Sequence, residues 1–124
     1  MKCLIVGGSG QFGICLSKIL LKRKYKVEIT TRSISRTKKK FKDLGLNKVN
    51  LIKLDIFDKK LTTKILKKKY DMIFYFAGQS SPSVSFNRAD QTIKSNYIGC
   101  KNFLEILQSL KLKTKFFNTS SSEI

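Results

Sequence analysis

Short apolar runs alternate with amphipathic segments along the whole chain, and this alternation constrains the fold more than any other feature. The apolar runs predict buried strands over residues 2–6, 27–31, 49–54, 72–76 and 115–119. The amphipathic segments predict helices after the first strand, from about 35 to 44, around 61–66 and from about 90 to 110. Such alternation is typical of βαβ units with helices on both faces of a parallel sheet. We therefore expect a single α/β domain of the doubly wound, Rossmann type, with strand order 3-2-1-4-5.

Two of the expected helices show an apolar face at helical spacing. In the first helix, Phe12, Cys15 and Ile19 recur at intervals of three and four, together with Leu16 and Leu20. In the last helix the same spacing places Tyr97, Cys100, Leu104 and Leu107 on one side. We expect these side chains, the cysteines included, to pack against the sheet.

The chain is strongly basic, with 26 Lys and Arg against 8 Asp and Glu, for a net charge of +18. Most of the bases are lysines spread through every expected helix, and no helix-turn-helix, zinc-finger or aromatic RNA-binding motif accompanies them. We therefore expect no specific nucleic-acid partner, only weak adhesion to polyanions at low salt.

The residue types and patterns that the chain lacks exclude several kinds of catalytic site, metal site and membrane segment. The chain has no His, and the spacing of its 3 Cys fits no zinc or redox motif, so we expect no metal site and no Ser–His or Cys–His catalysis. It has neither a membrane-length apolar run nor the pattern of a signal peptide. These features predict a cytoplasmic protein that does not enter a membrane.

A glycine-rich turn follows the first strand directly. Gly7, Gly10 and Gly13 form one spacing and Gly8, Gly10 and Gly13 a second, both between an expected strand and an expected helix. Glycine permits the tight turn and lets a pyrophosphate approach the backbone, while the helix N-terminus offers free N–H groups. The turn therefore predicts a dinucleotide site, the alternative being a glycine-rich turn without a ligand.

The residue after the second strand indicates which dinucleotide binds. NAD sites usually carry Asp or Glu there to accept from the ribose 2′-hydroxyl. Here Thr31, Arg32 and Ser33 follow one another without a carboxylate. A guanidinium can pair with a 2′-phosphate through two hydrogen bonds, so Arg32 favours NADP. The alternative is that Arg32 is a solvated loop cation.

The chain resembles the GDP-mannose 4,6-dehydratases, which are extended short-chain dehydrogenases of the NAD-dependent epimerase/dehydratase group. Beyond the glycine turn, three segments carry the resemblance: residues 76–86 after the fourth strand, residues 95–105 in the last helix, and residues 116–124 at the end of the fifth strand. The first and last of these are the more specific to the dehydratases. The resemblance implies a cytoplasmic lyase of nucleotide-sugar metabolism that converts GDP-mannose to GDP-4-keto-6-deoxymannose by transient hydride transfer and loss of water.

The resemblance also implies the cofactor-binding residues. It assigns the pyrophosphate to the turn, the 2′-phosphate to Arg32, the adenine to Asp55 and Ile56, and the nicotinamide ribose to the loop after the fourth strand. In full, the implied cofactor residues are Gly7, Gly10, Gln11, Phe12, Gly13, Arg32, Asp55, Ile56, Ala77, Gly78 and Gln79.

For the substrate, the resemblance implies that Ser121 polarises the sugar 4-hydroxyl, that Glu123 removes the C5 proton and that Ser85 contacts the nucleotide sugar. Ser121 and Glu123 follow a strand at its carboxyl end, where open α/β sheets place their sites. A lone Glu beside several hydroxyls can act as a base, although a Glu so near a chain end is more often simply solvated.

The resemblance covers only the N-terminal part of the family pattern. The family carries its Tyr-x-x-x-Lys pair on a helix after the fifth strand, and the pair found here, Tyr97 and Lys101, precedes that strand. We therefore expect residues 1–124 to form an incomplete NADP-binding domain that lacks the sugar-nucleotide domain. Such a chain would be inactive alone. It would derive from a split gene, a pseudogene or a fragment of a longer sequence. An intact family enzyme is expected to be a homo-oligomer. The alternatives are part of a related sugar-nucleotide epimerase or reductase, or a non-catalytic dinucleotide-binding module.

Overall fold

Five parallel strands form the centre of the protein. The structure is a computed structural model, and it describes residues 1–8, 10–76 and 98–118. The strands are β1 (Lys2–Val6), β2 (Lys26–Thr31), β3 (Asn50–Lys53), β4 (Met72–Tyr75) and β5 (Lys115–Asn118). They pair side by side in the order β3-β2-β1-β4-β5, which confirms the order predicted from the alternation. The predicted strand limits lie within one residue of the observed ones.

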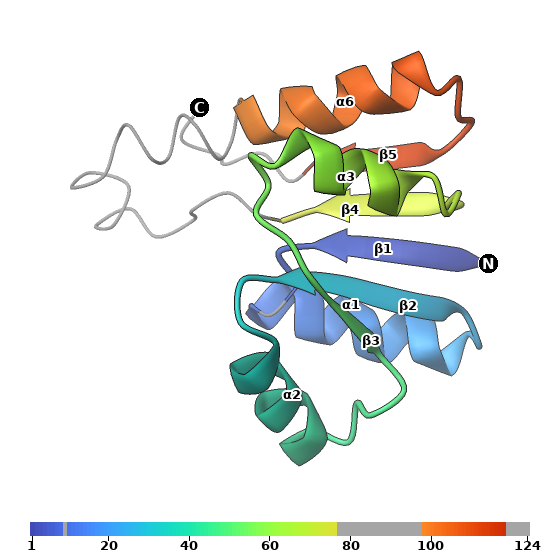
Figure 1. Ribbon diagram of the computed structural model, residues 1–124. Helices are drawn as coiled ribbons and strands as arrows, with labels where there is room; N and C mark the ends of the chain where they lie inside the picture. The colour runs from blue at the N-terminus through green and yellow to red at the C-terminus, as the bar shows by residue number, and fades with distance from the viewer. Residues whose placement is uncertain (9, 77–97, 119–124) are drawn as a thin grey trace, which may run out of the picture.

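Helices cover both faces of this sheet. They are α1 (Gln11–Lys22), α2 (Ile34–Asp43), α3 (Lys59–Leu66) and α6 (Cys100–Ser109). In Figure 1, α1 and α2 lie on one face of the sheet, whereas α3 and α6 lie on the other. This is the doubly wound arrangement that the sequence predicts.

Because all strands run the same way, the sheet has two unlike ends. We call the end where the strands finish the carboxyl end and the end where they start the amino end. In Figure 1 the arrowheads mark the carboxyl end at the left, and the N-terminus lies at the amino end. Every described strand-to-helix connection lies at the carboxyl end and every helix-to-strand connection at the amino end.

Two apolar clusters, one on each face, hold the layers together. Leu4, Ile73 and Phe103 belong to the cluster under α3 and α6. Cys3, Ile5 and Ile29 belong to the cluster under α1 and α2. Alternate residues of β1 thus enter opposite clusters, as the period of a strand buried on both faces requires.

The predicted apolar face of α1 is wrong in most of its members. The buried residues of α1 are Gly13, Ile14, Ser17 and Leu20. Phe12 is 74% exposed and Ile19 52% exposed, and Cys15 is exposed as well. The helix approaches the sheet through its small residues, and the Ser17 hydroxyl is satisfied by donating to the Gly13 carbonyl at 2.7 Å. The spacing of apolar residues alone does not reveal that a glycine and a serine belong to the buried face.

The predicted face of α6 is partly right. Cys100 and Leu107 are buried, but Leu104 is 47% exposed. Phe103 takes its place in the core, where its ring meets the Tyr75 ring edge-on with centroids 5.6 Å apart. Tyr97 lies outside the described residues.

Candidate functional site

The turn between β1 and α1 adopts a backbone that depends on glycine. Gly7 has a φ of 72°, in the left-handed region that other residues rarely adopt. Its N–H donates to the Thr30 hydroxyl of β2 at 3.0 Å, which ties the ends of β1 and β2 together. Sequence reasoning missed Thr30, although a hydroxyl within an otherwise apolar strand was the available signal.

Close packing fixes the position of α1 above this turn. A Cβ added at Gly13 would overlap the carbonyl oxygen and backbone of Gly8. The helix can therefore start this near to the turn only because Gly13 has no side chain. By contrast, a Cβ at Gly10 would meet nothing within 4 Å, so the backbone is open at that point.

The start of α1 offers a site for an anion. Gly10 is the N-cap residue and supplies no side-chain hydrogen bond to the first turn, which also carries no acidic residue. The N–H groups of a first helical turn have no partner within the helix and carry a partial positive charge. Gln11 and Phe12, both exposed, belong to this first turn. A pyrophosphate is the kind of group that fits here.

Arg32 lies beside this turn because β2 pairs with β1. Hydrogen bonds on either side of Arg32 fix its backbone: Thr31 shares a hydrogen bond with Thr37 at 2.8 Å, and the Ser33 hydroxyl caps α2. The Arg32 side chain itself is exposed. The protein thus holds a guanidinium at the carboxyl end of β2, next to the glycine turn.

The carboxyl end of β3 supplies Asp55 and Ile56. The Leu54 N–H donates to the Thr31 carbonyl at 3.1 Å, which brings this segment next to Arg32. The Asp55 carboxylate accepts from the Phe57 N–H at 3.0 Å and remains exposed, whereas Ile56 is buried in the core. Ile56 could therefore contribute to a ligand site chiefly through its backbone.

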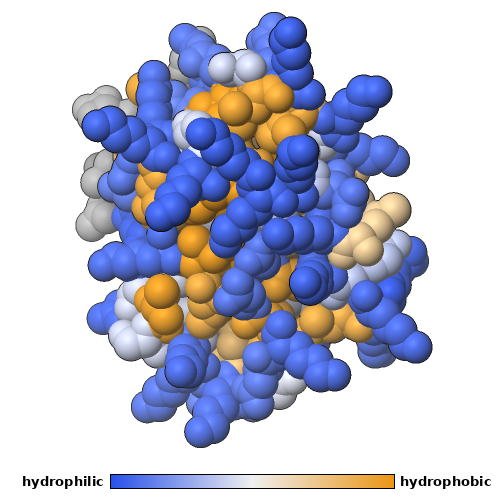
Figure 2. All heavy atoms as spheres, turned by 45° about the vertical axis from the view of Figure 1, so that its right-hand side comes forward, coloured by the Kyte–Doolittle hydropathy of each residue, from blue (hydrophilic) through white to orange (hydrophobic). Residues whose placement is uncertain are grey.

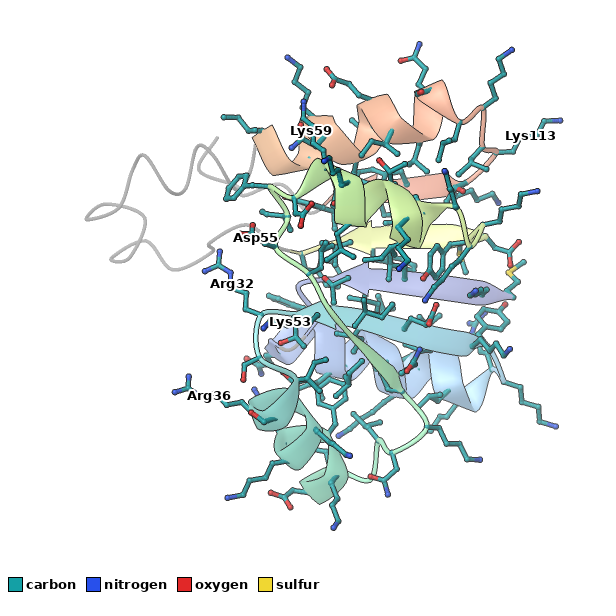
Figure 3. The ribbon with its side chains drawn as sticks, in the orientation of Figure 1. Arg32, Arg36, Lys53, Asp55, Lys59 and Lys113 are labelled. Carbon is teal, nitrogen blue, oxygen red and sulfur yellow. The ribbon has the colours of Figure 1, made fainter. Side chains whose placement is uncertain are left out.

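Figure 3 shows how the charged groups lie at this end of the sheet. Arg32, Arg36, Lys53 and Asp55 all lie at the carboxyl end, where the side chains of Arg32 and Arg36 reach away from the sheet. Thr31 and Lys53 are register partners in β2 and β3. The described part of the end of β2 therefore presents cations and hydroxyls, and Asp55 lies one strand further on.

The remaining predicted site residues lie outside the described residues. They are Ala77, Gly78, Gln79, Ser85, Ser121 and Glu123. The structure thus brings together the glycine turn, Arg32 and Asp55, and it does not test the substrate and catalytic assignments. Within residues 1–8, 10–76 and 98–118, no three His, Cys, Asp or Glu side chains gather into a possible metal site. None of the helices in those ranges has the length and hydrophobicity needed to cross a bilayer.

Comparison with known proteins agrees with this geometry. Residues 4–124 match the family model of GDP-mannose 4,6 dehydratase. The chain is 34% identical to a GDP-mannose 4,6-dehydratase of Vibrio cholerae, covering 98% of this chain and 35% of that protein. It is 28% identical to a UDP-N-acetyl-alpha-D-glucosaminuronate decarboxylase of Bacillus cytotoxicus, covering 99% of this chain and 37% of that protein. The chain thus spans little more than a third of the length of these relatives.

Solved structures share the fold. The UDP-glucose-4-epimerase of Stenotrophomonas maltophila, solved with bound NAD and formylated UDP-arabinopyranose, superimposes with a TM-score of 0.84. The match covers 100% of this chain and 38% of the epimerase at 20% sequence identity. At that identity the likeness shows a shared fold alone.

Proposed function

Because the chain belongs to the GDP-mannose 4,6-dehydratase family, we propose that it forms the cofactor-binding part of such an enzyme and that its cofactor is NADP. One observation carries the proposal: the glycine turn and Arg32 adjoin at the carboxyl ends of paired strands. The first element suits a pyrophosphate and the second a 2′-phosphate.

The residues present fit this cofactor. The open backbone at Gly10 and the uncapped start of α1 would hold the pyrophosphate. Arg32 would hold the 2′-phosphate, and the segment at Asp55 would border the adenine. Bound NADP supplies a hydride acceptor that is regenerated within one turnover. The protein's part is to bind and orient it, through backbone groups and one guanidinium.

For the substrate we propose the roles that the family pattern assigns. Ser121 would hydrogen-bond the sugar 4-hydroxyl, Glu123 would take the proton from C5 as water leaves across C5–C6, and Ser85 would contact the nucleotide sugar. GDP-mannose is the proposed substrate, by membership of the family. The intact enzyme is proposed to be cytoplasmic and homo-oligomeric.

These 124 residues by themselves are proposed to be inactive. The pattern Tyr-x-x-x-Lys occurs at Tyr97 and Lys101. Lys101 lies on the exposed side of α6, where its ammonium is 3.8 Å from the Glu105 carboxylate. Lys101 is thus paired within its own helix, which supports its assignment as a surface residue. Incubation with GDP-mannose and NADP should yield no 4-keto-6-deoxy product.

A second candidate is a related sugar-nucleotide epimerase or reductase that binds NAD. The 28% identity to a decarboxylase shows that this N-terminal sequence is shared among enzymes with different chemistry. The epimerase of Stenotrophomonas maltophila was solved with NAD. Cofactor choice separates the two candidates, because only the first requires a partner for a 2′-phosphate.

The test is a titration of the chain with NADP and with NAD, before and after Arg32→Ala. A charge-assisted hydrogen bond contributes about 1.5–3 kcal/mol, so Arg32→Ala should weaken NADP binding by roughly tenfold to a hundredfold. NAD binding should change little. Arg36→Ala serves as the control, since it removes the same charge one helical turn further on. Equal affinity of the unchanged protein for the two cofactors would refute the proposal.

A further inference from the structure

The amino end of the sheet concentrates positive charge. Its helix-to-strand connections and first strand residues carry eleven basic side chains: Lys2, Arg23, Lys24, Lys26, Lys48, Lys67, Lys68, Lys69, Lys111, Lys113 and Lys115. All but Lys2 are exposed. Among the described residues of the same segments the acid is Asp71, which already accepts from the Lys2 backbone N–H at 2.7 Å. Figure 2 turns this side toward the viewer, and hydrophilic side chains stand out across it.

The general excess of lysine does not account for this concentration. At the carboxyl end, the described connections (7–8, 10, 32–33 and 54–58) and the last strand residues carry Arg32 and Lys53 against Asp55 and Asp58. Among the described residues, the charges at the carboxyl end therefore cancel, whereas those at the amino end are strongly positive. A uniform excess of lysine would have made both ends basic.

Helix dipoles explain only part of the charge. A cation near a helix C-terminus is favourable, and the helices end at the amino end. One cation per helix would serve that purpose. The segment after α3 carries three consecutive lysines, and the segment after α6 carries Lys111 and Lys113 before Lys115 begins β5.

Three of these lysines occupy positions that favour glycine. Lys24, Lys69 and Lys111 have φ values of 62°, 60° and 53°, in the left-handed region. Each follows the last turn of a helix, where glycine is the usual residue, and the equivalent position after α2 is Gly45, with a φ of 72°. The chain thus places cations at this end even where the backbone disfavours any side chain.

The basic surface is also hollowed. Lys2, Lys24, Lys26 and Lys48 line an open hollow of about 460 Å³, together with Asn50, the half-buried Tyr25 and the buried carboxylate of Glu28. Glu28 already engages the Lys2 ammonium at 3.8 Å and the Asn50 amide at 2.6 Å. The exposed lysines of the hollow, Lys24, Lys26 and Lys48, carry ammonium groups, which are donors that suit phosphate oxygens. A hollow of this size admits a phosphate with part of the sugar attached to it.

From these observations we propose that the amino end binds the phosphodiester backbone of duplex nucleic acid without preference for base sequence. Four strand spacings of about 4.8 Å make the sheet about 19 Å wide, a length over which a duplex carries about eleven negative charges. Lysine ammonium groups commonly contact phosphates, and such contacts carry no sequence information. This activity is separate from cofactor binding, which takes place at the opposite end.

A bilayer with anionic lipids is the less suitable partner. Membrane-surface proteins commonly lay an amphipathic helix flat in the interface. Here the described helices point their C-terminal ends at the amino end, so none can lie flat against a membrane that faces it (Figure 1). Among the described residues, the large apolar side chains exposed at this end are Met1 and Leu44, which offer little apolar surface to insert into a bilayer.

The experiment measures binding of the whole chain to two fluorescent 20-base-pair DNA duplexes of unrelated sequence, by anisotropy, over a series of salt concentrations. The test variant combines Lys24→Gly, Lys69→Gly and Lys111→Gly, which removes three charges and relieves three strained positions. We expect its melting temperature to rise while its affinity at 150 mM salt falls at least tenfold, about equally for both duplexes. The slope of log affinity against log salt should become shallower by about 2 to 3.

The matched control combines Lys18→Gln, Lys39→Gln and Lys60→Gln, which removes three charges from exposed positions within α1, α2 and α3. It should keep the slope of the unchanged chain. Equal losses in both triple variants would overturn the proposal, because net charge alone would then explain binding. Absence of binding to either duplex at 150 mM salt would overturn it as well. So would retention of the chain on phosphatidylserine vesicles but not on DNA.

Discussion

The two ends of the sheet are built from the same strands but follow opposite rules. At the carboxyl end the backbone itself forms the proposed cofactor site: Gly7 makes the turn, Gly13 lets the helix approach, and Gly10 leaves space. At the amino end side chains predominate, with lysines at the surface and a buried carboxylate, Glu28, behind them. Where the backbone packs as closely as at Gly13, no added atom is tolerated, whereas a surface of side chains tolerates exchange of individual residues. The two ends should therefore respond very differently to mutation.

Glu28 is the centre of the buried part of the amino end. It accepts from the Tyr70 hydroxyl at 2.7 Å and from the Asn50 amide at 2.6 Å. The ammonium groups of Lys2 and Lys68 lie 3.8 and 3.9 Å from its carboxylate. Burial alone would raise the pKa of Glu28, but these hydrogen bonds and charges together lower it. The network joins the starts of β1, β2 and β3 to the segment before β4.

The largest effect is expected from Gly13→Val at the carboxyl end. Even a Cβ would overlap the Gly8 backbone, so the helix or the turn must move. We expect a loss of about 3 kcal/mol in the free energy of unfolding, at the upper end for overpacked sites, together with loss of NADP binding. Urea unfolding and a cofactor titration measure the two effects.

Gly10→Ala is the matched control for this prediction. Its Cβ would enter open space, so stability should change by less than about 0.5 kcal/mol. NADP affinity should nevertheless fall, because the methyl group would occupy space needed by the pyrophosphate. If Gly13→Val unfolded no more easily than Gly10→Ala, the carboxyl end would not depend on close backbone approach.

The structure of the carboxyl end can be predicted from the sequence more fully than that of the amino end. Strand positions, strand order and the glycine turn follow from local patterns, since apolar runs and glycine spacing are read residue by residue. The buried face of α1 does not follow from such patterns, because Gly13 and Ser17 are buried whereas Phe12 and Ile19 are exposed. Small residues pack closely without raising hydrophobicity, so the periodicity indicates the wrong face.

The amino end was the harder part to foresee. Pairing of Glu28 with Tyr70 spans 42 residues of sequence, and nothing local marks either residue as a partner. The concentration of lysine at this end also depends on the topology, because it collects residues from separate helix-to-strand connections. Only the parallel arrangement brings them to one surface.

The second-largest effect is expected from Tyr70→Phe. The substitution removes a donor to a buried carboxylate while keeping the ring, so the free energy of unfolding should fall by about 1–3 kcal/mol. Tyr25→Phe is the control, because the Tyr25 hydroxyl makes no hydrogen bond to the described residues, and it should change stability by less than about 0.5 kcal/mol. Cofactor affinity, measured by titration, should be unchanged in both, since the site lies at the other end. A matching loss of NADP affinity in Tyr70→Phe would mean that the two ends are coupled.

A pH series examines the same carboxylate. Because folding lowers the pKa of Glu28, its contribution to stability is present at pH values above its unfolded pKa of about 4.3 and is lost as the pH falls through the folded value. Stability from urea unfolding should therefore drop below about pH 4. In Glu28→Gln the drop should be shallower, because the group no longer titrates. Curves of equal steepness would show that other carboxylates govern the acid limb.

The smallest effect is expected at a single left-handed lysine, and it has the opposite sign. Lys69→Gly should raise the free energy of unfolding by about 0.5–1 kcal/mol, because relief of the left-handed backbone exceeds the entropy that glycine adds to the unfolded chain. Gly45→Ala makes the reverse change at the equivalent position after α2, where the Cβ meets open space, so it isolates the backbone cost. It should lower stability by about 1 kcal/mol. Thermal melts of the two variants measure both effects. If Lys69→Gly were instead destabilising, then Lys69 would stabilise the fold through its favourable interaction with the C-terminus of α3. The lysines at the amino end would then be explained by stabilisation of the helix C-termini rather than by binding of a partner.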